Sequence, residues 1–304
     1  MHISVLLNEC IENLNLKDNS VIVDCTLGYG GHSSEILKRI KNGKLYSFDQ
    51  DDIAIKAATE RLDKVGNNYQ IIKSNFVNLK DELTKYENEV DGILYDLGVS
   101  SPQLDVDERG FSFHNDAKLD MRMDNSNPIS AYEIVNNYSF EELTNILYKY
   151  GEEKYASGIV KRIIQYRENK PIETTLELVE IIKTGVPEKY KRDKHPARKT
   201  FQAIRIEVNK ELDVFEKSLK DSLDLIKVGG RVCVITFHSL EDKICKSLFK
   251  SVCEVDKNFK NMPIIPEHLQ PRFKIIANIA PSDEELEKNN RARSARLRVI
   301  ERVR

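Results

Sequence analysis

The sequence contains no tryptophan, and cysteine is scarce, with five residues among 304. No two cysteines form a C-x-x-C pair, and no cysteines and histidines cluster at the spacing of a zinc site, so we expect no metal centre. Scattered single cysteines of this kind predict free thiols, which suit a reducing compartment. They are Cys10, Cys25, Cys233, Cys245 and Cys253.

The chain also lacks a strong net charge, a targeting segment and a long apolar run. It carries 47 Lys+Arg against 49 Asp+Glu, a net charge of −2, so a nucleic-acid surface would have to be a local basic patch. The first residues have no basic stretch followed by a long apolar one, which argues against a signal peptide. No segment is apolar for long enough to cross a membrane. We therefore expect a cytoplasmic protein without membrane contact.

The first hundred residues do contain short apolar runs that end in an acid and alternate with helical patterns. We expect strands at 21–24, 44–49, 69–72 and 92–96, with helices between them. Strand and helix in alternation at this spacing predict an α/β fold with a Rossmann-like parallel sheet.

The next buried strand is expected only at 231–237, far beyond the roughly 30 residues that a crossover between parallel strands needs. The additional residues between the two strands have helical patterns, including the capping-box spacing of Ser139 and Glu142. We predict an inserted helical domain at 106–199, which divides a ligand-binding domain formed by 1–105 and 200–304.

Two further expectations concern the second half of that domain. Apolar residues step by three or four from Thr200 to Lys227, which predicts one long crossover helix. The segments 273–279 and 296–303 predict a terminal antiparallel pair.

The turn after the first strand, Gly28-Tyr29-Gly30-Gly31-His32, is the first candidate ligand site. Glycines here let a ligand approach the backbone closely. The pattern is not G-x-G-x-x-G, and so tight a turn suits an adenosyl ligand without a pyrophosphate, although a glycine-rich turn alone is a weak signal. Asp49, at the end of the second strand, strengthens it because a carboxylate there accepts from both ribose hydroxyls. A solvated acid or a helix cap is the alternative.

Two later strand ends add polar and aromatic groups. Phe76 follows the third strand and either stacks on adenine or belongs to the core. Asp96 ends the fourth strand and opens a loop that runs to Gln103 with glycine, hydroxyl and amide groups. Acceptors in such a loop hold an exocyclic amine in line with a sulfonium methyl group.

Local basic patches suit phosphates even in a chain without net positive charge. One surrounds the segment 195–205, and the other lies at 291–298. A solvated charged face is the alternative for either patch. His238, at the end of the fifth strand, is a candidate substrate contact. The alternatives are a structural histidine or a helix cap formed by Ser239 with Asp242. Candidate RNA-binding residues are His195, Arg198, Lys199, Arg205 and His238.

Several segments together resemble one known family, the bacterial ribosomal RNA small subunit methyltransferase H family. Its members are S-adenosylmethionine-dependent cytosine-N4 methyltransferases, and the resemblance runs from Val5 to Arg298. The segments that carry it are Gly28-Tyr29-Gly30-Gly31-His32-Ser33, 96–105, Glu108-Arg109-Gly110-Phe111-Ser112-Phe113, 119–124, 195–203 and 237–242.

The resemblance implies a class I methyltransferase sheet and S-adenosylmethionine as cofactor. It implies cytidine N4 in the decoding region of 16S ribosomal RNA as the target, in free RNA or in the small ribosomal subunit. It does not identify a general base, for which Asp96 is the only candidate, and it leaves a homodimer open. The implied cofactor contacts are Gly30, Gly31, His32, Asp49, Phe76, Asp96 and Gln103.

Three functions other than ribosomal RNA methylation would require different sequence patterns. A DNA amino-methyltransferase usually carries an Asp-Pro-Pro-Tyr type loop, which the loop after Asp96 does not match. If the chain were a non-catalytic RNA-binding protein, we would expect substitutions in the glycine turn or at Asp49, and both are intact. A nicotinamide dehydrogenase would carry G-x-G-x-x-G.

Overall fold

The computed structural model describes residues 4–98, 107–193, 195–260 and 262–304. The chain divides into two compact units. The first, here the sheet unit, consists of Met1–Gly98 and Leu212–Arg304, and the second, the inserted unit, is Val99–Glu211. No helix in the described ranges is long and apolar enough to span a membrane.

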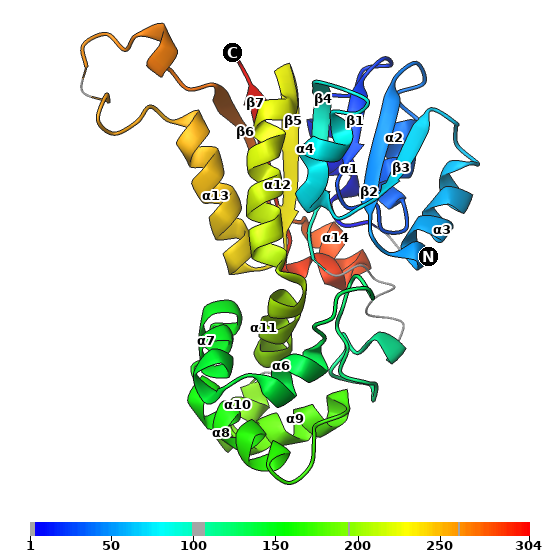
Figure 1. Cartoon of the computed structure of the whole chain (residues 1–304). Coiled ribbons are helices and arrows are strands. Elements are labelled where there is room, and N and C mark those ends of the chain that lie inside the picture. The colour runs from blue at the N-terminus through cyan, green and yellow to red at the C-terminus, as the bar shows by residue number, and fades with distance from the viewer. Residues whose placement is uncertain (1–3, 99–106, 194, 261) are drawn as a thin grey trace. The chain divides into compact units, whose positions relative to one another are not determined.

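The sheet unit is built on seven strands in the order β3-β2-β1-β4-β5-β7-β6 (Figure 1). β1 to β5 are parallel, and β7 lies antiparallel between β5 and β6. This order confirms the Rossmann-like sheet and the terminal antiparallel pair, which extends the main sheet. The strands are β1 Val21–Asp24, β2 Lys44–Asp49, β3 Tyr69–Lys73, β4 Val90–Asp96, β5 Ile226–Thr236, β6 Phe273–Ile279 and β7 Arg296–Arg302.

Alternating side chains of the strands fill two separate cores, one on each face of the sheet. In β4, Ile93 and Tyr95 enter one core, whereas Leu94 enters the other. Cys233 of β5 is fully buried, as expected of a small apolar filler. Helices α4 (Leu79–Leu83), α12 (Glu211–Leu225) and α13 (Ser239–Cys253) cover the first face; α1 (Leu7–Asn13), α2 (Gly31–Leu37), α3 (Asp52–Leu62) and α14 (Asp283–Lys288) cover the second.

The inserted unit is helical, as predicted from its pattern. Capping boxes begin three of its helices, at Ser130, at Ser139 and at Thr174, and the one at Ser139 confirms the predicted spacing. Its helices are α6 Ala131–Asn137, α7 Phe140–Gly151, α8 Ala156–Arg167, α9 Thr175–Thr184, α10 Glu188–Asp193 and α11 Arg198–Asn209.

The single crossover helix predicted from Thr200 to Lys227 is wrong. The structure has two helices, α11 and α12, because Lys210 adopts a left-handed conformation with φ of 50° and ends α11. Strand β5 then begins at Ile226, within the predicted helix. As a result α11 belongs to the inserted unit, whose boundary lies at Glu211 rather than at residue 199.

Candidate functional site

Acidic residues end three neighbouring parallel strands at the same edge of the sheet. Asp24 ends β1, Asp49 ends β2 and Asp96 ends β4. β1 is paired with both of the other strands, so the glycine turn that follows it lies between the other two strand ends. Ligands of open α/β sheets bind at this edge.

The glycine turn brings bare backbone to this edge. Gly28 has φ of 50° and Gly30 has φ of 70°, a region that side chains with Cβ adopt only under strain. A Cβ on Gly30 would lie 3.2 Å from the Cβ of Ala58, and one on Gly31 would lie 2.0 Å from Oγ of Ser4. The glycines are therefore required by the turn and by close packing against α3.

Asp49 is held by two backbone amides. Its Oδ2 accepts from the N–H of Gly28 at 2.9 Å, and its Oδ1 accepts from the N–H of Asp51 at 2.9 Å. Burial raises the pKa of Asp49 to about 6, although these hydrogen bonds favour the charged form. A backbone hydrogen bond from Gln50 also favours the charged carboxylate, so of about four acceptor positions at least one remains for a ligand hydroxyl.

His32 and Asp96 form a second polar pair. The Nε2 atom of His32 lies 3.1 Å from the carbonyl oxygen of Val5, to which it donates, so Nδ1 is unprotonated in the neutral ring. That Nδ1 lies 3.5 Å from Oδ2 of Asp96. Burial lowers the pKa of His32 and raises the pKa of Asp96 well above its usual range. The pair therefore favours neutral groups in the free protein.

The other oxygen of Asp96 has no partner among the residues that the structure describes. Oδ1 is buried and makes no hydrogen bond within the described part of the chain. Besides burial, the charges of Asp24 and Glu241 raise the pKa of Asp96. An unsatisfied buried acceptor costs stability, so it marks a position where a ligand donor would be accommodated.

Two supporting residues at this edge were missed by the sequence analysis. Asp24 is buried and accepts from the hydroxyl of Ser33 at 2.7 Å and from the N–H of Thr26 at 3.0 Å. The hydroxyl of Thr26 in turn accepts from the N–H of Asp96 at 2.7 Å. Asp24 thus connects the first strand end to α2 and β4. Its signal in the sequence is its place as the acid that ends the apolar run 21–24, just before the glycine turn.

Phe76 lies in a short 3-10 helix, Phe76–Asn78, which directly follows β3. Its ring is half-buried against the core and meets Tyr95 edge to face, with centroids 5.8 Å apart. Its role toward adenine stays a prediction. Gln103 lies outside the described residues.

His238 precedes α13, and the predicted cap by Ser239 with Asp242 is wrong. Glu241 accepts from the backbone N–H groups of Phe237 at 2.7 Å and His238 at 3.3 Å. Nε2 of His238 lies 3.1 Å from Glu241, and Asp242 instead forms a two-pronged ion pair with Arg298. Arg298, from the C-terminal basic patch, is therefore neutralised.

The predicted RNA-binding residues of the inserted unit differ in their surroundings. Arg198 is exposed, and its guanidinium makes no ion pair or hydrogen bond with the residues that the structure describes. Lys199 donates to the carbonyl oxygen of Glu152 at 2.6 Å. Because this acceptor is neutral, it does not compensate the positive charge of the lysine. Arg205 forms two hydrogen bonds with Glu211, at 2.8 and 2.9 Å, and is mostly buried, which indicates a structural role.

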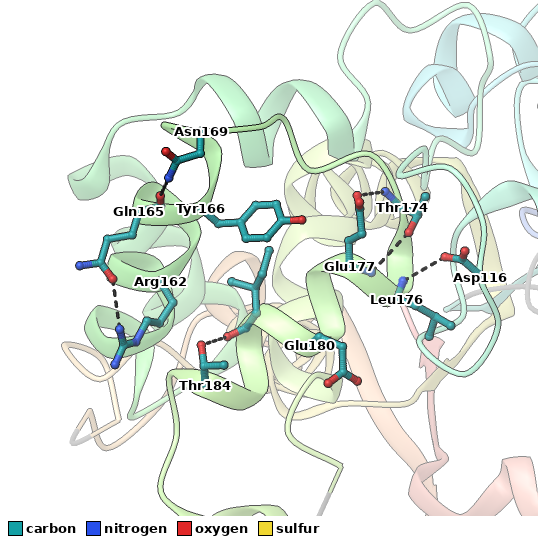
Figure 2. A pocket seen from close by; sticks show the side chains of 11 residues that line it. Asp116, Arg162, Gln165, Tyr166, Asn169, Thr174, Leu176, Glu177, Glu180 and Thr184 are labelled. Carbon is teal, nitrogen blue, oxygen red and sulfur yellow. Dashed lines mark hydrogen bonds between the residues drawn. The ribbon is translucent and has the colours of Figure 1, made fainter.

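The inserted unit also contains a pocket of 680 Å³ between α8 and α9 (Figure 2). Its lining includes the carboxylates of Asp116, Glu177 and Glu180, against the single guanidinium of Arg162. Lys170 pairs with Glu177 at 2.8 Å and Lys183 pairs with Glu180 at 2.6 Å, so the pocket has no excess of basic groups that would attract phosphates.

Comparisons with known proteins agree on one family. The model of the MraW methylase family matches residues 1–303. The chain is 54% identical over 312 residues to ribosomal RNA small subunit methyltransferase H of Finegoldia magna, covering 99% of this chain and 98% of the relative.

Two solved structures match the chain only distantly. An rRNA methylase from Streptococcus thermophilus is 13% identical with a TM-score of 0.46, and all of both chains is covered. A putative rRNA-methylase from Clostridium thermocellum is 13% identical with a TM-score of 0.47, covering 99% of this chain and 100% of the other. Likenesses this distant add nothing to the fold that the strand order establishes.

Proposed function

Because the chain belongs to the MraW methylase family, we propose that it methylates the exocyclic N4 of a cytidine in the decoding region of 16S ribosomal RNA. The name of the Finegoldia magna relative supports small-subunit ribosomal RNA as the substrate. The choice of cytosine N4 comes from the motif resemblance and is the part that needs the test below. Such a substrate places the enzyme in the cytoplasm.

The cofactor is S-adenosylmethionine, which supplies an electrophilic methyl group on a sulfonium. The residues at the sheet edge fit it. The glycine turn offers bare backbone at Gly28 and Gly30, Asp49 has acceptor capacity to spare, and Asp96 has a buried oxygen without a partner among the described residues. We assign the ribose hydroxyls to Asp49 and a ligand N–H group to Oδ1 of Asp96.

The protein's contribution to the reaction is positioning. A cytosine amine is a poor nucleophile because its lone pair is conjugated with the ring, so the enzyme gains most by holding it in line with the methyl group. Burial around Asp96 strengthens any hydrogen bond made there. Burial and the charges of Asp24 and Glu241 raise the pKa of Asp96, which disfavours its charged form in the free protein.

The single structural observation that supports the cofactor assignment is the hydrogen bond from Gly28 to Asp49. It joins the turn and the carboxylate that the sequence pointed to separately. We further propose that the inserted unit presents the RNA, whose cytosine must leave its stack to expose N4.

The test is transfer of labelled methyl from S-adenosylmethionine to small ribosomal subunits and to free 16S RNA, followed by identification of the modified nucleoside by mass. We expect N4-methylcytidine, and the two acceptors distinguish assembled from free RNA as substrate. Asp49→Ala should give no label, whereas Asp52→Ala, at an exposed neighbouring carboxylate, should label normally. No label from a chain that still binds the cofactor would reject the RNA substrate and direct the search to DNA and protein acceptors.

A further inference from the structure

A group of aromatic rings in the inserted unit is not explained by the site above. Phe113 and His195 are stacked, with centroids 4.5 Å apart and planes inclined by 25°. His114 adjoins both, with its centroid 4.5 Å from Phe113 and 5.4 Å from His195. Phe201 packs against Phe113 in a T-shaped arrangement, with ring centroids 5.7 Å apart. We call these four residues the ring group.

The ring group is graded in exposure. Phe201 is only 3% exposed and anchors the group in the core. Phe113 and His195 are half-buried, and His114 is exposed. Aromatic rings that are anchored on a buried side chain and exposed on their other side resemble the platforms on which unpaired bases stack.

Hydrogen bonding fixes the orientation of His195. Its Nδ1 accepts from the backbone N–H of Ala197 at 3.3 Å, so Nε2 carries the proton of the neutral ring. Burial, together with the nearby charges of His114 and Lys183, lowers the pKa of His195. A neutral, fixed imidazole offers both a flat face and one directed N–H donor.

The charge beside the ring group suits a nucleic-acid backbone. Helix α11 begins at Arg198, three residues after His195. Its cap is Ala197, and its first turn contains no acid. The positive end of this helix is therefore not compensated locally. Arg198 and Lys199 stand in the same turn, and neither forms an ion pair with a described carboxylate. Rings next to uncompensated positive charge are the combination that single-stranded RNA requires.

We propose that the ring group is a stacking site for an unpaired RNA base, with the first turn of α11 holding an adjacent phosphate. The inference rests on the proposed function, since RNA is the substrate class there. It adds a position on the inserted unit where the strand is held. Duplex RNA does not fit because its bases are already stacked on one another.

The test uses the full chain and a single-stranded oligoribonucleotide carrying one 2-aminopurine, whose fluorescence is quenched on stacking. We expect His114→Ala and His195→Ala to weaken binding by about 5- to 100-fold each and to lose the quenching. His114→Tyr should retain both, because it restores an aromatic face. His268→Ala, at an exposed histidine of the sheet unit, is the matched control and should behave as the parent.

The outcomes separate this inference from the proposed function. If the parent chain does not quench the probe, or if His114→Ala and His195→Ala bind and quench as the parent does, the stacking site is refuted. Methyl transfer to small subunits by the parent would then leave the proposed function standing. Support requires that the alanine variants raise the KM for RNA while S-adenosylmethionine affinity is unchanged. Loss of transfer by the parent would refute the proposed function whatever the probe shows.

Discussion

The backbone N–H of Gly28 donates a 2.9 Å hydrogen bond to Oδ2 of Asp49, which joins the turn after β1 to the end of β2, 21 residues further along the chain. The left-handed turn at Gly28 aims this N–H at the carboxylate, and the carboxylate in turn fixes the turn. Backbone and side chain at the proposed adenosyl site are thus ordered before a ligand arrives, which would lower the entropy cost of binding.

Replacing Asp49 should abolish cofactor binding in a folded protein. Two hydrogen bonds to a charged acceptor are worth about 1.5–3 kcal/mol each, so Asp49→Ala should weaken S-adenosylmethionine binding by roughly 100-fold or more. Titration calorimetry measures the affinity, and circular dichroism checks the fold. Asp52→Ala is the control, because Asp52 is 76% exposed and pairs only with Lys73 among the described residues. Parent-like affinity in Asp49→Ala would reject the ribose assignment.

Cofactor affinity should fall in acid. The pKa of Asp49 is raised to about 6, so the ionised form that accepts from ribose hydroxyls is lost as the pH drops below that value. Binding should weaken by up to about tenfold per pH unit below 6. For stability the sign is opposite, since a raised folded pKa stabilises the free chain in acid and this contribution is lost as the pH rises through about 6. Calorimetry between pH 5 and pH 8 tests the affinity, and Asp49→Asn should lack the inflection near pH 6.

Gly30→Ala should disturb both stability and cofactor binding. At φ of 70°, with Ala58 only 3.2 Å from the new Cβ, we expect a loss of about 1–3 kcal/mol in the free energy of unfolding. Gly229→Ala is the matched control, because Gly229 has φ of 83° but nothing within 4 Å of its Cβ position. It should share the strain and keep the cofactor affinity. Urea unfolding and calorimetry measure the two effects, and equal affinities in the two variants would contradict a role of Gly30 in the ligand turn.

Neutralising Arg198 and Lys199 should weaken RNA binding and leave cofactor binding unchanged. Each lost phosphate contact lowers the slope of log affinity against log salt by about 0.7 for single-stranded RNA. Arg198→Gln with Lys199→Gln should therefore reduce the slope by roughly one to one and a half. The control pair is Lys161→Gln with Arg162→Gln, exposed basic neighbours on α8 of the same unit. An unchanged slope would remove the first turn of α11 from the RNA surface.

Arg205 should prove structural, contrary to the prediction made from its place in a basic cluster. Its guanidinium and Glu211 are both largely buried, so Arg205→Ala should destabilise the chain by about 1–3 kcal/mol. A double-mutant cycle with Glu211→Gln should show that the two losses are coupled. A salt slope of RNA binding that falls in Arg205→Lys without loss of stability would instead support the RNA role.

The predictable parts of the fold are those governed by near neighbours in the chain. Strands β1 and β2 were predicted to the residue, because each is an apolar run that ends in an acid. The capping box at Ser139 was predicted because its four residues carry the whole signal. The break at Lys210 was not, because the apolar stripe continues through it and a lysine does not signal a left-handed residue.

The sequence by itself determined the parallel sheet and the helical insertion, and it predicted the two parts of the proposed adenosyl site, the glycine turn and Asp49. Only the tertiary structure decided which groups surround them. It placed Asp24 and Glu241 where their charges reach Asp96, paired Arg205 with Glu211, and stacked Phe113 on His195 across 82 positions of the chain. Local patterns are set by residues three or four apart. The burial of a side chain, the pKa of a carboxyl group and the stacking of two rings depend on contacts between segments that are distant in the chain. A local sequence pattern does not specify such contacts.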